Sequence, residues 1–232
     1  NEATVMKVAD FRAQMRLERS VLRVEGPEAR PFLHGLLTSD IENVPAGDAS
    51  YGALLTPQGK ILFDVFVREE GEALLIDCAT SQEADLLKRL AMYKLRAKVE
   101  ISAAPELAVA VSSTEMTGGY VDPRTAALGW RAFVSKGSIA PGIGYHAARI
   151  AAGLADTDAD LGSAEFFPHE ANFDQFGAVS FTKGCYVGQE VVSRMEHRGL
   201  ARARILPVTC DGAAPPKGSD IRAGEKSVGT ML

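Results

Sequence analysis

A lone cysteine, Cys185, lies between two glycines in the stretch Lys-Gly-Cys-Tyr-Val-Gly-Gln-Glu over residues 183–190. A short apolar run over 178–181 predicts a buried strand before it, and the turn-free run 189–195 predicts a helix after it. The thiol is therefore expected in a strand-to-helix turn, where backbone N–H groups and the ammonium of Lys183 favour a thiolate. A lone cysteine among apolar residues is also typical of a small core residue, so both interpretations stay open.

A second candidate group is Asp64, in the second strand of an expected β-hairpin. Two apolar runs, 51–55 and 61–67, are joined by a Thr-Pro-Gln-Gly-Lys turn. Strand alternation places the Asp64 carboxyl on the same face as Leu62 and Phe66. Burial without a partner would raise the pKa of this carboxyl and make it a candidate general base, or an acceptor for a nitrogen heterocycle. The alternative is an edge-strand aspartate that faces water.

Composition limits the classes of function. The chain has 232 residues, of which 46% are hydrophobic and 24% charged, as is typical of a globular protein with a sizeable core. A net charge of −5 argues against direct nucleic-acid binding, because phosphate contacts need a basic surface. No run of 18 apolar residues is present, so neither a membrane span nor a membrane partner is expected.

The cysteine pattern limits the metal chemistry. Cys78, Cys185 and Cys210 form no Cys-x-x-Cys pair, so neither a disulfide framework nor a zinc site is indicated, and no metal site is assigned. The odd count favours a reducing compartment. Because a conventional iron–sulfur cluster takes four cysteine ligands, this chain is not expected to hold one alone.

The order of the predicted elements indicates the fold class. Runs of strands with one or two helices between them predict an α+β fold rather than alternating βαβ units. Helical spacing recurs near 32–37, 86–93 and 145–153, whereas residues 201–208 alternate as a strand. A connection rich in Gly, Pro and Asp over 114–124 is a place for a domain boundary.

The stretch 183–190, together with its flanking residues 177–181 and 198–199, closely resembles the signature of the YgfZ family of folate-binding proteins. That family is related to the glycine-cleavage T-protein, and its mitochondrial members serve iron–sulfur cluster assembly. The strings over 32–41 and 54–60 resemble further family segments. The resemblance therefore covers most of the chain.

The resemblance implies a fold, which is a T-protein-like multi-domain α+β ring with a ferredoxin-like domain and a C-terminal β-barrel lobe. We expect a first folate-binding α+β domain over 1–112. In an alternative division of the chain, residues 145–200 complete this first domain. A second, ferredoxin-like region over 113–200 carries the Lys-Gly-Cys motif, and 201–232 begins the barrel lobe. Because family members continue into a complete barrel, the lobe is expected to be incomplete here.

The resemblance also implies a function, namely a tetrahydrofolate-binding accessory protein that supports assembly or repair of iron–sulfur proteins, including radical enzymes that modify tRNA. Its partners would be folate and iron–sulfur client or assembly proteins. Its location would be the cytoplasm, or the mitochondrial matrix in a eukaryote. Two alternatives stay open, a folate-dependent aminomethyl or one-carbon transferase and a non-catalytic interaction scaffold.

Roles for particular residues follow from the same resemblance. Cys185 would be a reactive or metal-contacting thiol, Lys183 would stabilise its thiolate, and Asp64 lies where the T-protein relatives carry a catalytic aspartate. Tyr145 would stack on the pteridine of the folate, and Arg149 would meet a carboxylate. Further folate contacts are expected from Asp64, Gln189, Glu190, Arg194 and Arg198.

The charged residues around the motif carry expectations of their own. Glu190 and Arg194 are four residues apart on the expected helix and should pair, which would orient the loop. Arg202 and Arg204 alternate in the expected strand and would suit an anionic ligand tail, such as the glutamate of folate. His169 stands where the family has glutamine and is expected to be structural.

Overall fold

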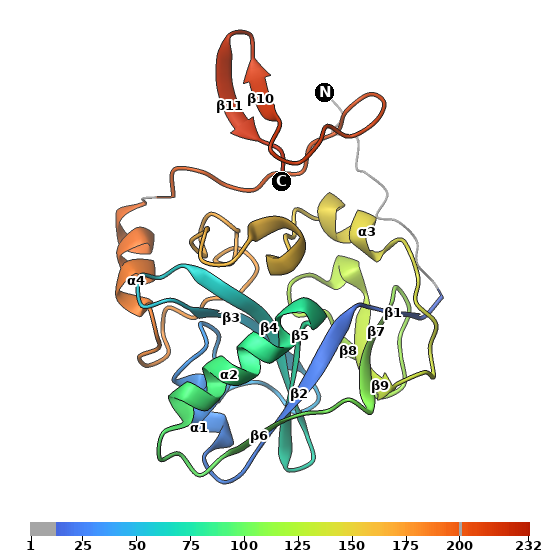
Figure 1. The fold of residues 1–232 in the computed structure, drawn as a ribbon, viewed down its shortest axis with the longest axis vertical. Helices are drawn as coiled ribbons and strands as arrows, with labels where there is room; N and C mark the ends of the chain where they lie inside the picture. Colours follow the sequence, from blue (N-terminus) through green and yellow to red (C-terminus); the bar gives the residue numbers. More distant parts are fainter. Residues whose placement is uncertain (1–12, 200) are drawn as a thin grey trace.

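The computed structural model describes residues 13–199 and 201–232, with two antiparallel sheets at its centre (Figure 1). Residues 1–12 of the domain expected over 1–112 lie outside this range. The larger sheet has five strands in the order β3-β4-β5-β2-β6. These strands are β2 (Arg19–Glu25), β3 (Ala49–Leu55), β4 (Ile61–Glu70), β5 (Ala73–Ala79) and β6 (Glu100–Ala103). Helices lie against this sheet rather than alternate with its strands, so the α+β prediction is confirmed.

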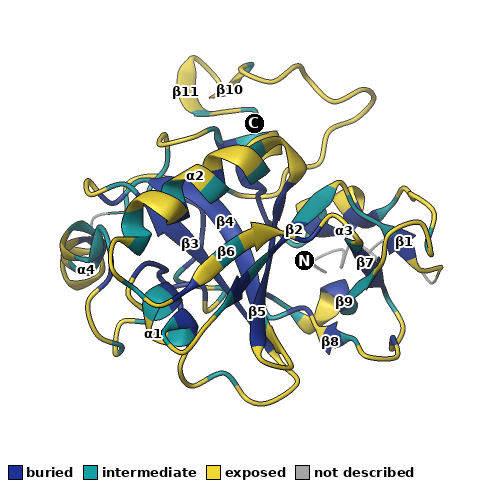
Figure 2. Cartoon of the chain, turned by 60° about the horizontal axis from the view of Figure 1, so that its bottom comes forward, coloured by how far each residue is buried: buried dark blue, intermediate teal, exposed yellow. Residues whose placement is uncertain are grey.

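The expected hairpin is confirmed as β3 and β4. Its turn closes where the backbone N–H of Thr56 donates to the carbonyl of Lys60 at 2.8 Å, and Gly59 adopts a φ of +81° that suits glycine. β3 is buried along its whole length and β4 along most of it, as Figure 2 also shows. Because β4 lies between β3 and β5, Asp64 is an interior residue, and its water-facing alternative is wrong.

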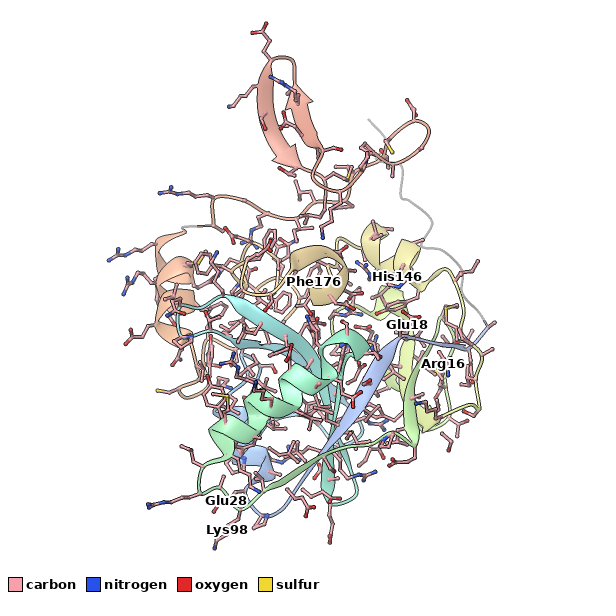
Figure 3. The ribbon with its side chains drawn as sticks, viewed as in Figure 1. Arg16, Glu18, Glu28, Lys98, His146 and Phe176 are labelled. Atoms are coloured by element: carbon pink, nitrogen blue, oxygen red, sulfur yellow. The ribbon has the colours of Figure 1, made fainter. Side chains whose placement is uncertain are left out.

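Two helices cover one face of the large sheet. The elements on this face are α1 (Ala29–His34), the 3-10 turn η1 (Thr80–Gln82) and α2 (Glu83–Lys94). Leu33 of α1 and Leu86 and Leu90 of α2 are buried in the same core cluster, which explains the helical spacing of these leucines. The carboxylate of Glu28 accepts a hydrogen bond from the backbone N–H of Lys98 at 2.9 Å, and so joins the start of α1 to the segment before β6 (Figure 3).

A second sheet follows in the order β1-β7-β9-β8. Its elements are β1 (Met15–Arg16), β7 (Leu107–Ser112), β8 (Tyr120–Val121) and β9 (Trp130–Ser135), with the 3-10 turn η2 (Ala126–Leu128) and helix α3 (Tyr145–Ala151) beside them. The helix predicted over 145–153 is thus confirmed. The expected domain boundary after residue 112 falls directly after β7. The strand that pairs with β7, β9, lies on the C-terminal side of this boundary.

The opposite face of the large sheet is covered by irregular chain. This region contains the π-helical turn η3 (Thr157–Leu161) and helix α4 (Gln189–Arg198). The helix expected after the cysteine is confirmed, but the strand predicted over 178–181 is wrong. Thr38 and Phe173 bond to that backbone instead of a strand. The Thr38 hydroxyl donates to the carbonyl of Ala178 at 2.6 Å and its carbonyl accepts from the N–H of Ser180 at 2.9 Å, while the N–H of Ala178 donates to the carbonyl of Phe173 at 2.9 Å.

The C-terminal part contains the hairpin of β10 (Asp220–Ala223) and β11 (Lys226–Thr230), which stands apart from the two sheets (Figure 1). The strand predicted over 201–208 is wrong. The backbone of this segment bonds to the turn near residue 170 and not to a strand, since the N–H of Ile205 donates to the carbonyl of Glu170 at 3.0 Å. Within the described ranges, no helix is long and apolar enough to cross a membrane.

Candidate functional site

Cys185 lies on the surface, in an irregular segment over 180–188 that is called the thiol loop below. The thiol is exposed, so the interpretation of Cys185 as a packed core residue is wrong. The side-chain amide of Gln189 lies 3.5 Å from the carbonyl oxygen of Gly184 and so links the start of α4 back to this loop. The loop therefore presents an accessible thiol four residues before α4 begins.

Lys183 holds the thiol loop against the end of α1. Its Nζ donates to the carbonyl oxygens of Leu37 at 2.6 Å and Ser39 at 2.9 Å, and also to that of His34. An ammonium has three donors, and these three carbonyls use all of them. Burial lowers the pKa of Lys183 to about 8, although two nearby carboxylates raise it. In this arrangement Lys183 clamps the backbone rather than donating to the thiol.

Two glycines bring the hairpin turn and the start of α4 into contact. A Cβ atom at Gly188 would lie 2.7 Å from the carbonyl oxygen of Thr56 and 3.0 Å from the Cα of Gly59. A Cβ atom at Gly59 would lie 2.9 Å from the Cβ of Val191. Both glycines also have a φ above +80°, which favours glycine in its own right. Two strings that lie far apart in the sequence therefore meet in one tight contact.

The remaining candidates on α4 face solvent. Val192 and Met195 form the buried side of the helix, whereas Glu190, Arg194 and Arg198 are exposed. Among the residues that the structure describes, no ion pair joins Glu190 to Arg194, so the expected pair is not formed. These charges are free to meet a ligand or a partner.

A cavity of about 760 Å³ adjoins the thiol loop. Tyr51, Phe176 and Phe181 are among its lining residues, and residues 180–182 of the thiol loop form part of one wall. Ser39 also lines it, and the buried Ser39 hydroxyl has no hydrogen-bond partner in the described part of the chain. A buried polar atom without a partner is costly, which makes this hydroxyl a candidate contact for a ligand.

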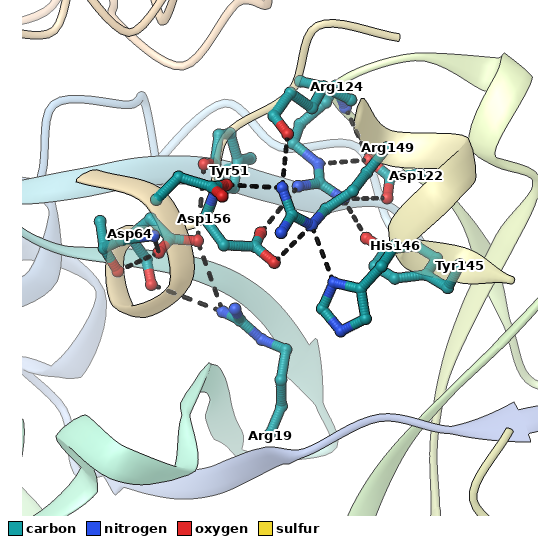
Figure 4. A network of polar contacts seen from close by, with 12 residues as sticks. Arg19, Tyr51, Asp64, Asp122, Arg124, Tyr145, His146, Arg149 and Asp156 are labelled. Carbon is teal, nitrogen blue, oxygen red and sulfur yellow. Dashed lines mark hydrogen bonds and ion pairs between the residues drawn. The ribbon is translucent and has the colours of Figure 1, made fainter. Parts of the chain in front are cut away.

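Two lining residues, Tyr51 and Asp122, belong to a buried network of arginines and aspartates (Figure 4). Arg124 binds Asp122 through its Nε at 3.0 Å and its Nη2 at 2.8 Å, and its guanidinium lies 5.1 Å from the centroid of the Tyr51 ring. Arg131 of β9 donates to Asp77 of β5, so the network ties the two sheets together. We call this set the ion network, and its members are Arg19, Tyr51, Asp64, Asp77, Asp122, Arg124, Arg131, Tyr145, Arg149 and Asp156.

Asp64 is fully buried within the ion network. Its Oδ1 accepts hydrogen bonds from the hydroxyl and, at 3.2 Å, from the backbone N–H of Thr157, and its Oδ2 lies 3.6 Å from Arg19. Burial alone would raise the pKa of the Asp64 carboxyl, but Arg19 and Thr157 lower it below its ordinary value. The condition for a raised pKa, burial without a partner, is therefore not met, and Asp64 is a bound carboxylate.

A second carboxyl of the network behaves in the opposite way. Burial, and then the nearby Asp64 carboxylate, raise the pKa of Asp156, although Arg149 lowers it. Arg149 pairs with Asp156 at 2.8 Å and with Asp160 at 2.6 Å. The pKa values of these two carboxyls therefore move in opposite directions, because Arg19 and Thr157 stabilise the Asp64 carboxylate and that carboxylate in turn disfavours ionisation of Asp156.

Tyr145 and Arg149 lie inside the ion network rather than on the cavity lining. The Tyr145 hydroxyl accepts a hydrogen bond from Arg131 at 2.9 Å and another from Arg124. Both side chains are buried, and their polar groups meet protein groups (Figure 4). In this structure they support the wall of the cavity from within the protein.

Among the described residues, one group approaches a metal-binding arrangement, namely His169, Asp174 and Glu196, whose ligand atoms lie within 4.8 Å of one another. The Nε2 of His169 lies 3.0 Å from a carboxylate oxygen of Glu196. However, Arg204 binds both oxygens of Asp174 at 2.7 Å. Its guanidinium already neutralises this carboxylate, so the group is an ion-pair cluster that ties α4 to the turn near residue 170.

Several network residues escaped prediction from the sequence. Asp77 and Arg131 are single charges inside apolar strands, and that pattern is the signal that could have identified them. Arg19, Asp122 and Arg124 lie at strand ends or in connections, where charged residues are ordinary. Their roles become visible only when the two sheets are packed together.

Comparison with known proteins identifies the relatives of this chain. Residues 202–232 match the family of the C-terminal β-barrel domain of CAF17. The human iron–sulfur cluster assembly factor IBA57, mitochondrial, is 34% identical over 92% of this chain and 75% of its own length. The mouse protein of that name is 34% identical, and this chain spans 66% of its length. The IBA57 homologue of Neurospora crassa is 30% identical, with 58% of its length covered.

A solved structure supports the fold assignment. The glycine cleavage system aminomethyltransferase T from Bartonella henselae superposes with a TM-score of 0.65 over 84% of this chain and 65% of that chain. The two sequences are 16% identical, so this similarity concerns the fold alone. The expected T-protein-like architecture is confirmed, and residues 202–232 match the barrel-domain family.

Proposed function

The chain belongs to the YgfZ family, which includes the IBA57 iron–sulfur cluster assembly factors, and from this premise we propose that it is a tetrahydrofolate-binding accessory protein for iron–sulfur cluster assembly. The observation that carries the proposal is the exposed Cys185 in a loop whose first residues line the cavity. Its client proteins would include the tRNA-modifying radical enzymes implied by the resemblance. The relatives are named as mitochondrial, and the location of this chain stays a prediction.

Cys185 would offer one thiolate to an iron–sulfur cluster that is shared with a partner protein. The chain cannot supply a full ligand set by itself, because Cys78 is buried and its burial raises its pKa to about 12. Cys210 is exposed but lies in a separate loop, 25 residues after Cys185 in the sequence. A shared cluster uses one cysteine from this chain and the rest from the partner, and an exposed loop is where a partner can reach it.

The cavity has the features that a reduced folate requires. Its volume of about 760 Å³ is in the range of small-molecule sites, and the rings of Phe176 and Phe181, which are less buried than Tyr51, can pack against a flat pteridine. The unpartnered Ser39 hydroxyl can hydrogen-bond to a polar edge of that ring. When bound, tetrahydrofolate supplies a carrier for one-carbon units. Tyr145 and Arg149 would position the cavity wall through Arg124 and Asp156.

The anionic tail of the folate needs cations outside the cavity. Asp40 and Asp48 line the cavity and would repel a carboxylate, so the tail would bind outside the lining. Arg194 and Arg198 remain the proposed contacts for it, and neither has an ion-pair partner within the described residues. Gln189 and Glu190, at the start of the same helix, are proposed to orient the loop.

The transferase alternative receives less support from the geometry. A general base must reach the proton that it removes, and Asp64 is sealed inside the ion network and does not line the cavity. Its connection to the cavity runs through the Tyr51 hydroxyl, which lies 3.5 Å from its Oδ2. We therefore keep Asp64 as a positioning residue of the cavity.

The test compares two exposed cysteines in a strain that lacks its own copy of this protein. Cys185→Ser should abolish restoration of an iron–sulfur client enzyme, whereas Cys210→Ser, the matched control, should restore it. Tetrahydrofolate binding, measured by calorimetry, should be retained in both variants. Equal restoration by the two variants would refute the role of the thiol.

The folate part of the proposal has a separate test. Phe181→Ala removes one aromatic ring from the cavity lining and should weaken tetrahydrofolate binding about fivefold, which corresponds to about 1 kcal/mol of aromatic packing. Leu206→Ala, an exposed apolar side chain outside the lining, is the control. Unchanged binding in Phe181→Ala would place the folate elsewhere.

A further inference from the structure

The C-terminal half of α2 presents an outward surface with both apolar and basic side chains. Met92 is 60% exposed and Leu95, the residue that ends the helix, is 87% exposed. Lys88 and Ala91 are exposed at spacings of three and four residues from Met92 and Leu95, which places them on the same side of the helix, and Arg96 is exposed just after the helix ends. We call these five residues the outer α2 surface, and the exposed colour of α2 is visible in Figure 2.

Positive charge is concentrated at this surface. Five of the 25 lysines and arginines lie within residues 86–99, a segment without aspartate or glutamate, although the whole chain has a net charge of −5. Through the described ranges, none of these five cations forms an ion pair. Glu28 binds the backbone N–H of Lys98 rather than a side-chain cation, and Asp85 and Glu100 flank the segment. The surface is thus a basic region whose cations have no ion-pair partner in the part of the chain that the structure describes.

Leu95 adopts a backbone conformation that leucine disfavours. Its φ is +44° and its ψ is −105°, in a region that glycine occupies far more readily. The turn behind it is closed by a hydrogen bond from the N–H of Ala97 to the carbonyl of Lys94 at 2.7 Å. In the isolated chain this leucine therefore strains the backbone and gains no burial. Its side chain would gain burial only against another molecule.

We propose that the outer α2 surface docks an acidic amphipathic helix of a partner protein. Met92 and Leu95 would meet the apolar stripe of that helix around the small Ala91, and the surrounding cations would pair with its carboxylates. Two large apolar side chains make a compact contact of the kind that protein interfaces bury at their centre. The outer α2 surface lies on the α1–α2 face of the large sheet. The buried side chains of α4, Val192 and Met195, belong to the irregular region on the opposite face.

The test uses the full chain and defined probes. A helical peptide with glutamates and a leucine stripe is compared, by fluorescence anisotropy, with the same peptide in which every leucine is replaced by glutamine. A short mixed-sequence RNA and vesicles that contain phosphatidylserine are measured beside them. We expect the leucine peptide to bind about tenfold or more tightly than the glutamine peptide, as expected for burial of an apolar side chain.

Two variants separate binding from folding. Leu95→Gly should raise or preserve the thermal midpoint, because glycine fits this backbone conformation, yet weaken the leucine peptide about tenfold. Ile143→Ser, at a side chain that is 94% exposed, is the control and should leave binding unchanged. Equal binding of the two peptides, tighter binding of RNA or vesicles, or unchanged binding by Leu95→Gly would each overturn the proposal.

Discussion

Replacement of Lys183 by methionine separates two roles for this residue, a clamp on the backbone and a stabiliser of the thiolate. Methionine keeps the apolar stem and removes the ammonium. The structure shows this ammonium bonded to the carbonyls of His34, Leu37 and Ser39, which lie at and just after the end of α1. Lys183→Met leaves three acceptors without this donor and frees the thiol loop from α1.

The magnitude follows from the number and exposure of these bonds. A hydrogen bond from a charged donor contributes about 1.5–3 kcal/mol when it is buried. Because Lys183 is only partly buried, water can replace part of each bond, so we expect the three together to contribute about 2–4 kcal/mol to the free energy of unfolding. Lys136→Met, at an exposed lysine, is the matched control and should change stability by less than about 0.5 kcal/mol.

The assay has two readouts, urea unfolding and the rate at which iodoacetamide alkylates Cys185 in a protein with Cys78 and Cys210 replaced by serine. The clamp predicts a loss of stability, with an alkylation rate that is unchanged or higher because the loop is freer. A thiolate stabiliser predicts a slower alkylation rate at neutral pH with stability unchanged. The second pattern would refute the assignment of Lys183 as a clamp. Tetrahydrofolate should slow the alkylation of Cys185 only if ligand binding in the cavity changes the thiol loop.

Two further predictions concern the supporting shell. Gly188→Ala should lower the free energy of unfolding in urea by about 2–4 kcal/mol, because its Cβ would meet the Thr56 carbonyl at 2.7 Å in a left-handed conformation. Gly184→Ala, with open space around it, is the control and should change that free energy by less than about 0.5 kcal/mol. Equal losses in the two variants would contradict the contact. Asp64→Asn should cost about 2–3 kcal/mol at pH 7, because it removes one of the two carboxylates that face the buried Arg19 and leaves Asp77 as the other. The pKa of Asp64 is lowered from 3.8 in the folded state, so its contribution to the free energy of unfolding is present above about pH 4 and is lost as the pH falls through the folded pKa. The difference in unfolding free energy between parent and variant should therefore be smaller at pH 3 than at pH 7. A difference that stays constant would contradict the shift.

The sequence alone was sufficient where structure depends on neighbours along the chain. The hairpin around Gly59, the helices near residues 90, 148 and 193, and the α+β class follow from local periodicity and turn residues. The family resemblance followed from the string over 183–190, since it needs no coordinates. Strands over 178–181 and 201–208 were predicted wrongly, because an apolar run or an alternating pattern indicates a strand only if another strand is there to pair with it.

Tertiary structure decided the partners of the charged groups, and with them the chemistry of the site. Lys183 is separated by 146 positions from Leu37, and Asp64 by 93 from Thr157, so no local pattern could show these bonds. The pKa of a buried carboxyl depends on whether a cation lies beside it, and only packing brings Arg19 to Asp64. For the same reason, the sequence could place the cysteine beside a lysine but could not show that this lysine is bound to the backbone of α1.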